Sequence, residues 1–224
     1  ALILWRALRA YESPSRSASR WLLDQKGRTL APKDDPHHVA GHDTTLVGWP
    51  WVDETHSWLE PTAMTVLALR GCGFGSHARV EEGLRLIRNR AIGSGGWNYG
   101  NRAVFGRALR AQPGPTGLAL LALAGTGART EVVSRALNYL KATLPAVRAP
   151  ASLAWGVIGL RAWGESQPSA DRWLEESYAK LSGRLDAAPR LACLLLAAVD
   201  TTSLFPGQPS KRANTAAGCD PGAI

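Results

Sequence analysis

The sequence contains few of the residues that cross-link a small domain or bind zinc. Its three cysteines, Cys72, Cys193 and Cys219, lie far apart in a chain of 224 residues. An odd number without regular spacing excludes a disulfide framework and a zinc knuckle. Free thiols fit a reducing compartment, so we expect a cytoplasmic protein.

Long hydrophobic runs and the common catalytic motifs are also missing. No apolar run of about 18 residues is free of charge, Gly and Pro, so we predict no transmembrane helix. No signal peptide is visible at the start. The chain has no Ser/His/Asp set, phosphate-binding loop or nucleotide fingerprint. Its only methionine is Met64, so the chain has no initiator and can be a piece of a longer protein.

The net charge of +8 at pH 7 comes mostly from arginine, but the arginines are scattered one or two at a time. A nucleic-acid interface should instead be a basic stripe interleaved with aromatic residues. We therefore expect no nucleic-acid partner and interpret the arginines as a solvated surface. The charge remains compatible with peripheral contact to an anionic membrane.

What the sequence does have is an internal repeat. Pro61–Gly73 and Pro115–Gly127 match at seven of thirteen positions without a gap. Ala151–Gly164 and Pro189–Asp200 have the same apolar character, and the opening Ala1–Glu12 reads as a fifth copy. A helix that is apolar nearly all the way round has neighbours on every side. These segments therefore predict buried, inner helices.

Helices of a second kind lie between the inner ones. In Thr130–Leu144 the apolar residues form one stripe at spacings of three and four, and Asp171–Leu185 repeats the pattern. Ala78–Ile92 and Ser17–Gly27 are weaker versions. Glycines after the inner helices, followed by Ser or Thr, predict short turns and helix caps. Each inner helix is thus expected to form a hairpin with the outer helix that follows it.

Two connections between hairpins are long, about Arg28 to Leu59 and Ser94 to Gln112. Long ordered loops in a compact helical domain are usually where function is found. The tail from Thr201 is rich in Gly, Pro, Ser and Ala and has no helical pattern. We therefore divide the chain into a repeat domain, residues 1–200, and a loosely held C-terminal tail, residues 201–224.

The stretch "EGLRLIRNRAIGSGGW" places Gly83, Gly95 and Trp97 at the spacing of [K/R]-G-x-x-[F/Y/W]-L-x-x-x-Q-x-x-x-G-x-W, while Glu82 and Ala91 depart from it. In this the chain resembles the terpenoid cyclase and protein prenyltransferase superfamily. The resemblance implies an all-α fold, an α/α toroid of inner and outer helix hairpins around an apolar lumen. With four to five hairpins here, the ring is incomplete or the chain is part of a longer one.

The segment that starts the second inner helix, "WLEPTA", carries the candidate acid. In squalene-hopene-type cyclases the protonating motif Asp-x-Asp-Asp-Thr-Ala begins an inner helix, and alignment by Thr-Ala places Glu60 at the proton-donating aspartate. Trp58 and Pro61 replace the other two carboxylates. A second interpretation is purely structural, because an acid beside a proline suits a helix start, where the dipole favours the anion. An ionised Glu60 cannot donate a proton.

Asp53 is the second candidate catalytic residue, since with Glu54 it could replace the missing carboxylates. Aromatic residues near these acids are candidate substrate-binding groups, because aromatic faces stabilise carbocations. Alternatively they close the end of the toroid and pack its loops; we favour this for Trp97 and leave both interpretations open for Trp49 and Trp51. The candidate aromatic residues are Trp49, Trp51, Trp58, Trp97 and Tyr99.

A metal site is weakly suggested by "PHHVAGHD", which offers His37, His38, His42 and Asp43. His38 and His42 are four residues apart, which suits a metal if the segment is helical. The prolines and Gly41 indicate a loop instead. We therefore expect neither a metal ion nor a cofactor.

Three functions follow from these observations. The first is a cyclase/prenyltransferase-like toroid that binds an apolar, isoprenoid-type ligand and is divergent or catalytically degenerate. If active, it would be a terpene cyclase-like isomerase or lyase, or a prenyltransferase-like transferase. The second is a non-catalytic helical scaffold that binds a protein partner through its long loops. The third is a carbohydrate-active α/α toroid with Asp53 and Glu60 as an acid–base pair, which requires carboxyl groups about 5–10 Å apart.

Overall fold

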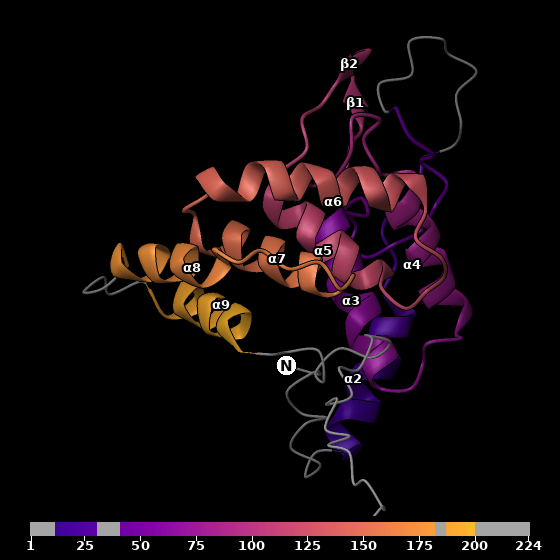
Figure 1. The fold of residues 1–224 in the computed structure, drawn as a ribbon. Coiled ribbons are helices and arrows are strands. Elements are labelled where there is room, and N and C mark those ends of the chain that lie inside the picture. Colours follow the sequence, from indigo (N-terminus) through magenta and orange to yellow (C-terminus); the bar gives the residue numbers. More distant parts are fainter. Residues whose placement is uncertain (1–11, 31–40, 182–186, 200–224) are drawn as a thin grey trace, which may run out of the picture.

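A computed structural model describes residues 12–30, 41–181 and 187–199, and this part of the chain is mostly helical (Figure 1). The predicted all-α class is confirmed. No helix of the described part is both long and apolar enough to cross a membrane. The helices are α2 (Glu12–Asp24), α3 (Leu59–Gly71), α4 (Ala78–Asn89), α5 (Pro113–Leu123), α6 (Glu131–Thr143), α7 (Pro150–Arg161), α8 (Ala170–Ala179) and α9 (Ala188–Ala198).

The predicted inner helices form one continuous row. Helix α3 packs against α5, α5 packs against α7, and α7 packs against α9 (Figure 1). Helices α4, α6 and α8 each pack against the inner helix that precedes them, which gives the expected hairpins. The inner helix predicted at 1–12 and the tail 201–224 lie outside the described residues, apart from Glu12, where α2 begins.

Helix α5 is the centre of the core, because every residue from Gly114 to Leu123 is buried. Its crossing with α7 depends on two glycines. A Cβ atom on Gly159 would lie 2.5 Å from the carbonyl oxygen of Gly117, and one on Gly117 would meet the backbone of Trp155. The two helices therefore touch backbone to backbone. This crossing leaves no space for a ligand between α5 and α7.

The outer helices bury only one face, as their sequence pattern predicts. In α6 the buried residues are Val133, Ala136, Leu137 and Leu140, spaced by three and four. The helix starts at Thr130, whose hydroxyl accepts the N–H of Val133 at 3.4 Å. A short 3₁₀ turn, η1 (Leu144–Ala146), then leads back to α7.

The prediction that every inner helix is surrounded by neighbours is wrong for α9. Leu195 is 65% exposed, and Ala188, Ala192 and Val199, on the same side of the helix, are exposed as well. The physical reason is position. Helix α9 is the last of the row in the described residues, and its main contacts there are with α7 and α8.

The second long connection contains a β-hairpin that the sequence analysis did not predict. Strand β1 (Ala103–Val104) pairs antiparallel with β2 (Arg107–Ala108). Figure 1 shows the hairpin standing clear of the helical body. At its base, the N–H of Gly41 donates to the carbonyl oxygen of Ala103 at 3.3 Å, so the two long connections meet here.

Candidate functional site at the start of helix α3

Two equivalent turns hold the loops that precede α3 and α5. The Thr62 hydroxyl accepts the N–H of Trp49 at 3.0 Å and donates to the carbonyl oxygen of the same residue at 3.5 Å. One repeat later, Thr116 makes the same pair of bonds to Trp97, at 2.9 and 3.1 Å. A Gly-Trp turn seated on the Thr of a Pro-Thr helix start is thus a structural unit of this repeat.

Both tryptophans of these turns lie in the core. Trp49 is 2% exposed and Trp97 is fully buried. The indole N–H of Trp49 donates to the carbonyl oxygen of Leu22 at 2.6 Å, and that of Trp97 to the carbonyl oxygen of Ile87 at 2.7 Å. As arranged here, neither indole face is open to a ligand. Both burials favour the interpretation that these tryptophans pack the loops, which the sequence analysis favoured for Trp97 and left open for Trp49.

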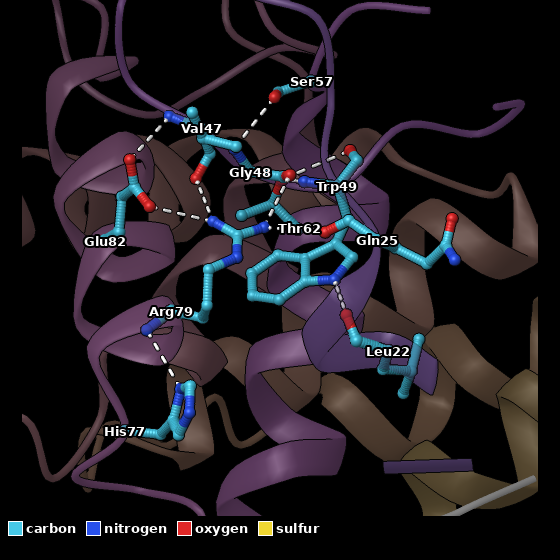
Figure 2. Close-up of polar contacts among 10 residues, drawn as sticks. All are labelled: Leu22, Gln25, Val47, Gly48, Trp49, Ser57, Thr62, His77, Arg79 and Glu82. Carbon is cyan, nitrogen blue, oxygen red and sulfur yellow. Dashed lines mark hydrogen bonds and ion pairs between the residues drawn. The ribbon is translucent and has the colours of Figure 1, made fainter. Parts of the chain in front are cut away.

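Arg79, which the sequence analysis did not single out, fixes the Trp49 turn from below (Figure 2). Its guanidinium carbon lies 4.4 Å from the centroid of the Trp49 ring, a cation–π stack. Glu82 pairs with it at 2.9 Å and also accepts the N–H of Val47 at 3.1 Å. The guanidinium donates, at 2.9 to 3.2 Å, to the carbonyl oxygens of Gln25, Val47 and Gly48.

Arg79 was not predicted from the sequence because the carbonyl oxygens that it contacts lie 31 to 54 residues away along the chain. The local signal was the i, i+3 pair Arg79 and Glu82, which is usually only a surface ion pair. Here the pair satisfies the backbone of an otherwise irregular loop. Glu82, a departure from the cyclase repeat, therefore has a structural role in this chain.

Glu60 lies in the first turn of α3 and is half-buried. It has no hydrogen-bond or ion-pair partner among the described residues. Burial raises the pKa of Glu60 above its ordinary value, and no neighbouring charge contributes to the shift. This acts against the ionised form that the helix start alone would favour. A protonated Glu60 is able to donate a hydrogen bond or a proton.

Asp53 lies apart from this environment, on the exposed loop 51–56. With the Gln25 amide nitrogen facing it, the Asp53 carboxylate accepts a hydrogen bond at 3.0 Å. Burial raises the pKa of Glu60, and the Asp53 charge does not contribute to this shift. Trp51, on the same loop, is 58% exposed and open to a partner.

The structure brings Trp58 and Tyr99 to the start of α3, next to Glu60. The N–H of Leu59 donates to the carbonyl oxygen of Tyr99 at 2.9 Å. The Trp58 ring covers Gly100, where a Cβ atom would lie 3.3 Å from it. Both aromatic side chains remain partly exposed. They are the two sequence-predicted aromatic residues that have exposed surface and whose backbone lies at the start of α3.

Below Glu60, one face of α3 is not covered by its neighbours. Glu60, Met64 and Ala68 follow each other at intervals of four, so they lie in one line along the helix. All three are at least partly exposed, and Met64 is 38% exposed, while almost every other residue of α3 is buried. We call this line the Glu60 face. It offers apolar contact with a carboxylic acid at one end.

A separate pocket of about 300 Å³ lies at the other end of α5, around the turn into α6. Its volume is at the lower end of small-molecule sites. Arg88 donates to the Thr126 hydroxyl at 2.9 Å at its edge. None of the candidate site residues predicted from the sequence lies in this pocket. It is lined by Arg88, Leu123, Thr126, Gly127, Ala128, Thr130, Val132, Val133 and Trp163.

No group of three or more His, Cys, Asp or Glu side chains suited to a metal ion occurs in the described residues. His37 and His38 lie outside them. Asp43 has a local role instead. It accepts the backbone N–H and the hydroxyl of Thr45 at 2.9 and 2.6 Å, and these bonds lower the pKa of Asp43.

Comparisons of the chain with protein-family models, with curated proteins and with solved structures find no match.

Proposed function

We propose that this chain binds an apolar, isoprenoid-type small molecule along the Glu60 face of α3. The observation that carries the proposal is Glu60 itself. Its carboxyl group is half-buried, has no partner in the described residues, and begins an apolar line through Met64 and Ala68. In the cyclase motif that the sequence resembles, the same position holds the acid that faces the ligand.

The chemistry of the face suits such a ligand. Covering Met64 and Ala68 with a hydrocarbon chain removes apolar surface from water, which contributes about 25 cal/mol per Å². A charged carboxylate would oppose this, because burying an unpaired charge is costly. The burial that raises the pKa of Glu60 acts in favour of its neutral form, which is the form that an apolar ligand requires. Trp58 and Tyr99 add aromatic contact at the same end.

We propose binding without efficient turnover. Protonating an alkene requires a strong acid that neighbouring groups hold in its protonated state. Trp58 and Pro61 occupy the motif positions of those carboxylates, and burial alone perturbs Glu60. The Asp53 charge does not contribute to the pKa shift of Glu60, so this shift gives no support to a carbohydrate-active acid–base pair.

The test is retention of squalene, farnesol and geranylgeraniol by the purified protein in equilibrium dialysis. The variant Met64→Arg places a charge in the middle of the Glu60 face and should lower retention about tenfold or more. Leu195→Arg, at a more exposed apolar position on α9, is the control and should bind as the wild type does. If none of the three compounds is retained, or if both variants behave alike, the proposal is wrong.

A second candidate is a scaffold that binds a protein partner through the long loops. It is favoured by Trp51 and Val52, which are neighbours on one loop and are both exposed. A Trp51→Ser/Val52→Ser double variant separates the two candidates. If the double variant loses a protein complex but still retains prenyl compounds, the scaffold function is supported. If it loses neither the complex nor the prenyl compounds, the scaffold function is wrong.

A further inference from the structure

The tip of the β1–β2 hairpin has a conformation that its residue type does not explain. The register pairs Val104 with Arg107, so Phe105 and Gly106 form a two-residue turn. Both have positive φ, +48° and +72°. Such turns favour Asn-Gly or Asp-Gly, because bulky residues rarely adopt this region. Phenylalanine is therefore an unfavourable choice for folding at this position.

Packing does not account for Phe105 either. Its side chain is 78% exposed, the largest exposed fraction among the large hydrophobic residues of the described chain. A strained position occupied by an exposed aromatic residue indicates a role outside the fold. The hairpin projects beyond the helices, so Phe105 is presented at an extremity of the molecule (Figure 1).

The described charged residues on the loop that contains the hairpin are all arginines. The side chains of Arg107 and Arg110 are exposed and have no hydrogen-bond or ion-pair partner in the described residues. The sequence from Gly83 to Thr130 contains seven arginines and no Asp or Glu. The nearby Asp43 binds Thr45, and its charge acts on Arg90. Among the described residues, the charged side chains of the loop that carries Phe105 are thus all cationic.

The base of the hairpin, by contrast, is held firmly. The side chain of Arg102 donates to the carbonyl oxygen of Gly41 at 2.7 Å. The N–H of Leu109 donates to the carbonyl oxygen of Arg102 at 2.8 Å, and the N–H of Gln112 donates to the carbonyl oxygen of Trp97 at 2.8 Å. Because the Arg102 side chain already donates to Gly41, Arg107 and Arg110 are the arginines of the described hairpin and its flanks whose side chains are available to a partner.

We propose that the β1–β2 hairpin docks on an anionic membrane surface, with Phe105 inserted at the interface and Arg107 and Arg110 at the lipid headgroups. An aromatic residue at a tip, with arginines behind it, matches the boundary between acyl chains and anionic headgroups. One aromatic residue and two cations give weak, reversible binding. The inference does not depend on isoprenoid binding, because the hairpin is separate from the Glu60 face.

The experiment is flotation of the full chain with phosphatidylcholine vesicles, alone or with about 30 mol% phosphatidylserine. We expect binding only with phosphatidylserine, and weaker binding when salt is raised to about 0.5 M. Phe105→Ala should lower the partition coefficient about tenfold. Arg107→Gln/Arg110→Gln should lower it by about tenfold or more. Leu195→Ala, an exposed apolar position on α9, should leave it unchanged.

Thermal unfolding of Phe105→Ala should match the wild type, because the side chain contacts solvent. The proposal is wrong if the wild type does not float with anionic vesicles. It is also wrong if Phe105→Ala floats as well as the wild type, since dispersed arginines would then account for adsorption. Equal loss of binding in Leu195→Ala would likewise overturn it.

Discussion

The hydroxyl of Thr62 is bonded to both the N–H and the carbonyl oxygen of Trp49, and Thr116 is bonded to Trp97 in the same way. This single contact seats each long loop on the helix that follows it. A tight approach is required, because a Cβ atom on Gly96 would lie 2.7 Å from the Thr116 hydroxyl. The repeat is thus defined in three dimensions by a Gly-Trp turn on a Pro-Thr helix start.

Removing the hydroxyl should therefore be costly although the shape is kept. Thr116→Val leaves the buried N–H of Trp97 without its acceptor, which should lower the free energy of unfolding by about 1–3 kcal/mol. The measurement is urea unfolding followed by circular dichroism. Thr55→Val, at an exposed threonine, is the control and should change stability by less than about 0.5 kcal/mol. Similar losses in both variants would show that the contact has no special role.

Trp97, Trp49 and Trp51 should differ in their effect on stability according to their burial. Trp97→Ala and Trp49→Ala should each lower the free energy of unfolding by about 3–5 kcal/mol, because both indoles are buried and hydrogen-bonded. Trp51→Ala should cost less than about 0.5 kcal/mol. Urea titrations of the three variants provide the comparison. A large loss in Trp51→Ala, or none in Trp49→Ala, would reverse our assignment of core and surface.

The raised pKa of Glu60 predicts a pH-dependent effect of Glu60→Gln. Below the ordinary value of 4.5, the carboxyl is protonated in both the folded and unfolded chains. As pH rises, the unfolded carboxyl ionises first, so the contribution of Glu60 to stability is lost as pH passes the raised value. Glu60→Gln should thus gain stability relative to the wild type between pH 4 and pH 7, by thermal unfolding.

The same variant tests catalysis. If Glu60 only binds ligand, Glu60→Gln keeps retention of prenyl compounds and no turnover is seen in either protein. A cyclisation activity of the wild type that disappears in Glu60→Gln would contradict binding without turnover. If instead the wild type becomes more stable than Glu60→Gln as pH rises toward 7, the effect of burial on the carboxyl is contradicted. The helix dipole would then account for the role of Glu60.

The crossing of α5 and α7 predicts a graded series of glycine substitutions. Gly117→Ala should lower the free energy of unfolding by about 3 kcal/mol or more, because its Cβ atom would meet backbone. Gly156→Ala would meet the Leu144 side chain, which can move, and should cost less. Gly93→Ala has open space and should be nearly neutral. Urea unfolding that gives the three variants equal stability would show that the helices separate easily.

The turn at the hairpin tip makes an independent prediction about stability. Asparagine tolerates positive φ, so Phe105→Asn should raise the free energy of unfolding by about 1 kcal/mol. It should also abolish vesicle binding, because the apolar side chain is gone. A stability scan beside the flotation experiment measures both. A destabilised Phe105→Asn would mean that Phe105 packs against the protein.

The helical class and the boundaries of the hairpins were predictable because the two periodicities are strong. The all-round apolar segments became α3, α5, α7 and α9, and the striped segments became α4, α6 and α8. The same pattern overestimated the burial of α9, since periodicity describes a helix surface and not how many neighbours it has. The arrangement of the hairpins into a ring remains a prediction.

The long loops were located from the sequence, but not their contents. Arg79 reaches Gln25 and Gly48 across large sequence separations, which no local pattern reveals. The β-hairpin was missed because its strands have two residues each and its turn uses Phe-Gly. The candidate aromatics were separated only by burial, with Trp49 and Trp97 inside and Trp51 outside.

The most direct test of ligand binding at the Glu60 face is photo-cross-linking with a diazirine-bearing farnesyl probe, followed by mass spectrometry of tryptic peptides. The account predicts label on the peptide that ends at Arg70, at or near Met64, with competition by unlabelled farnesol and loss of label in Met64→Arg. Label confined to the pocket lined by Arg88, Leu123 and Trp163 would contradict this account, as would the absence of any label that farnesol displaces.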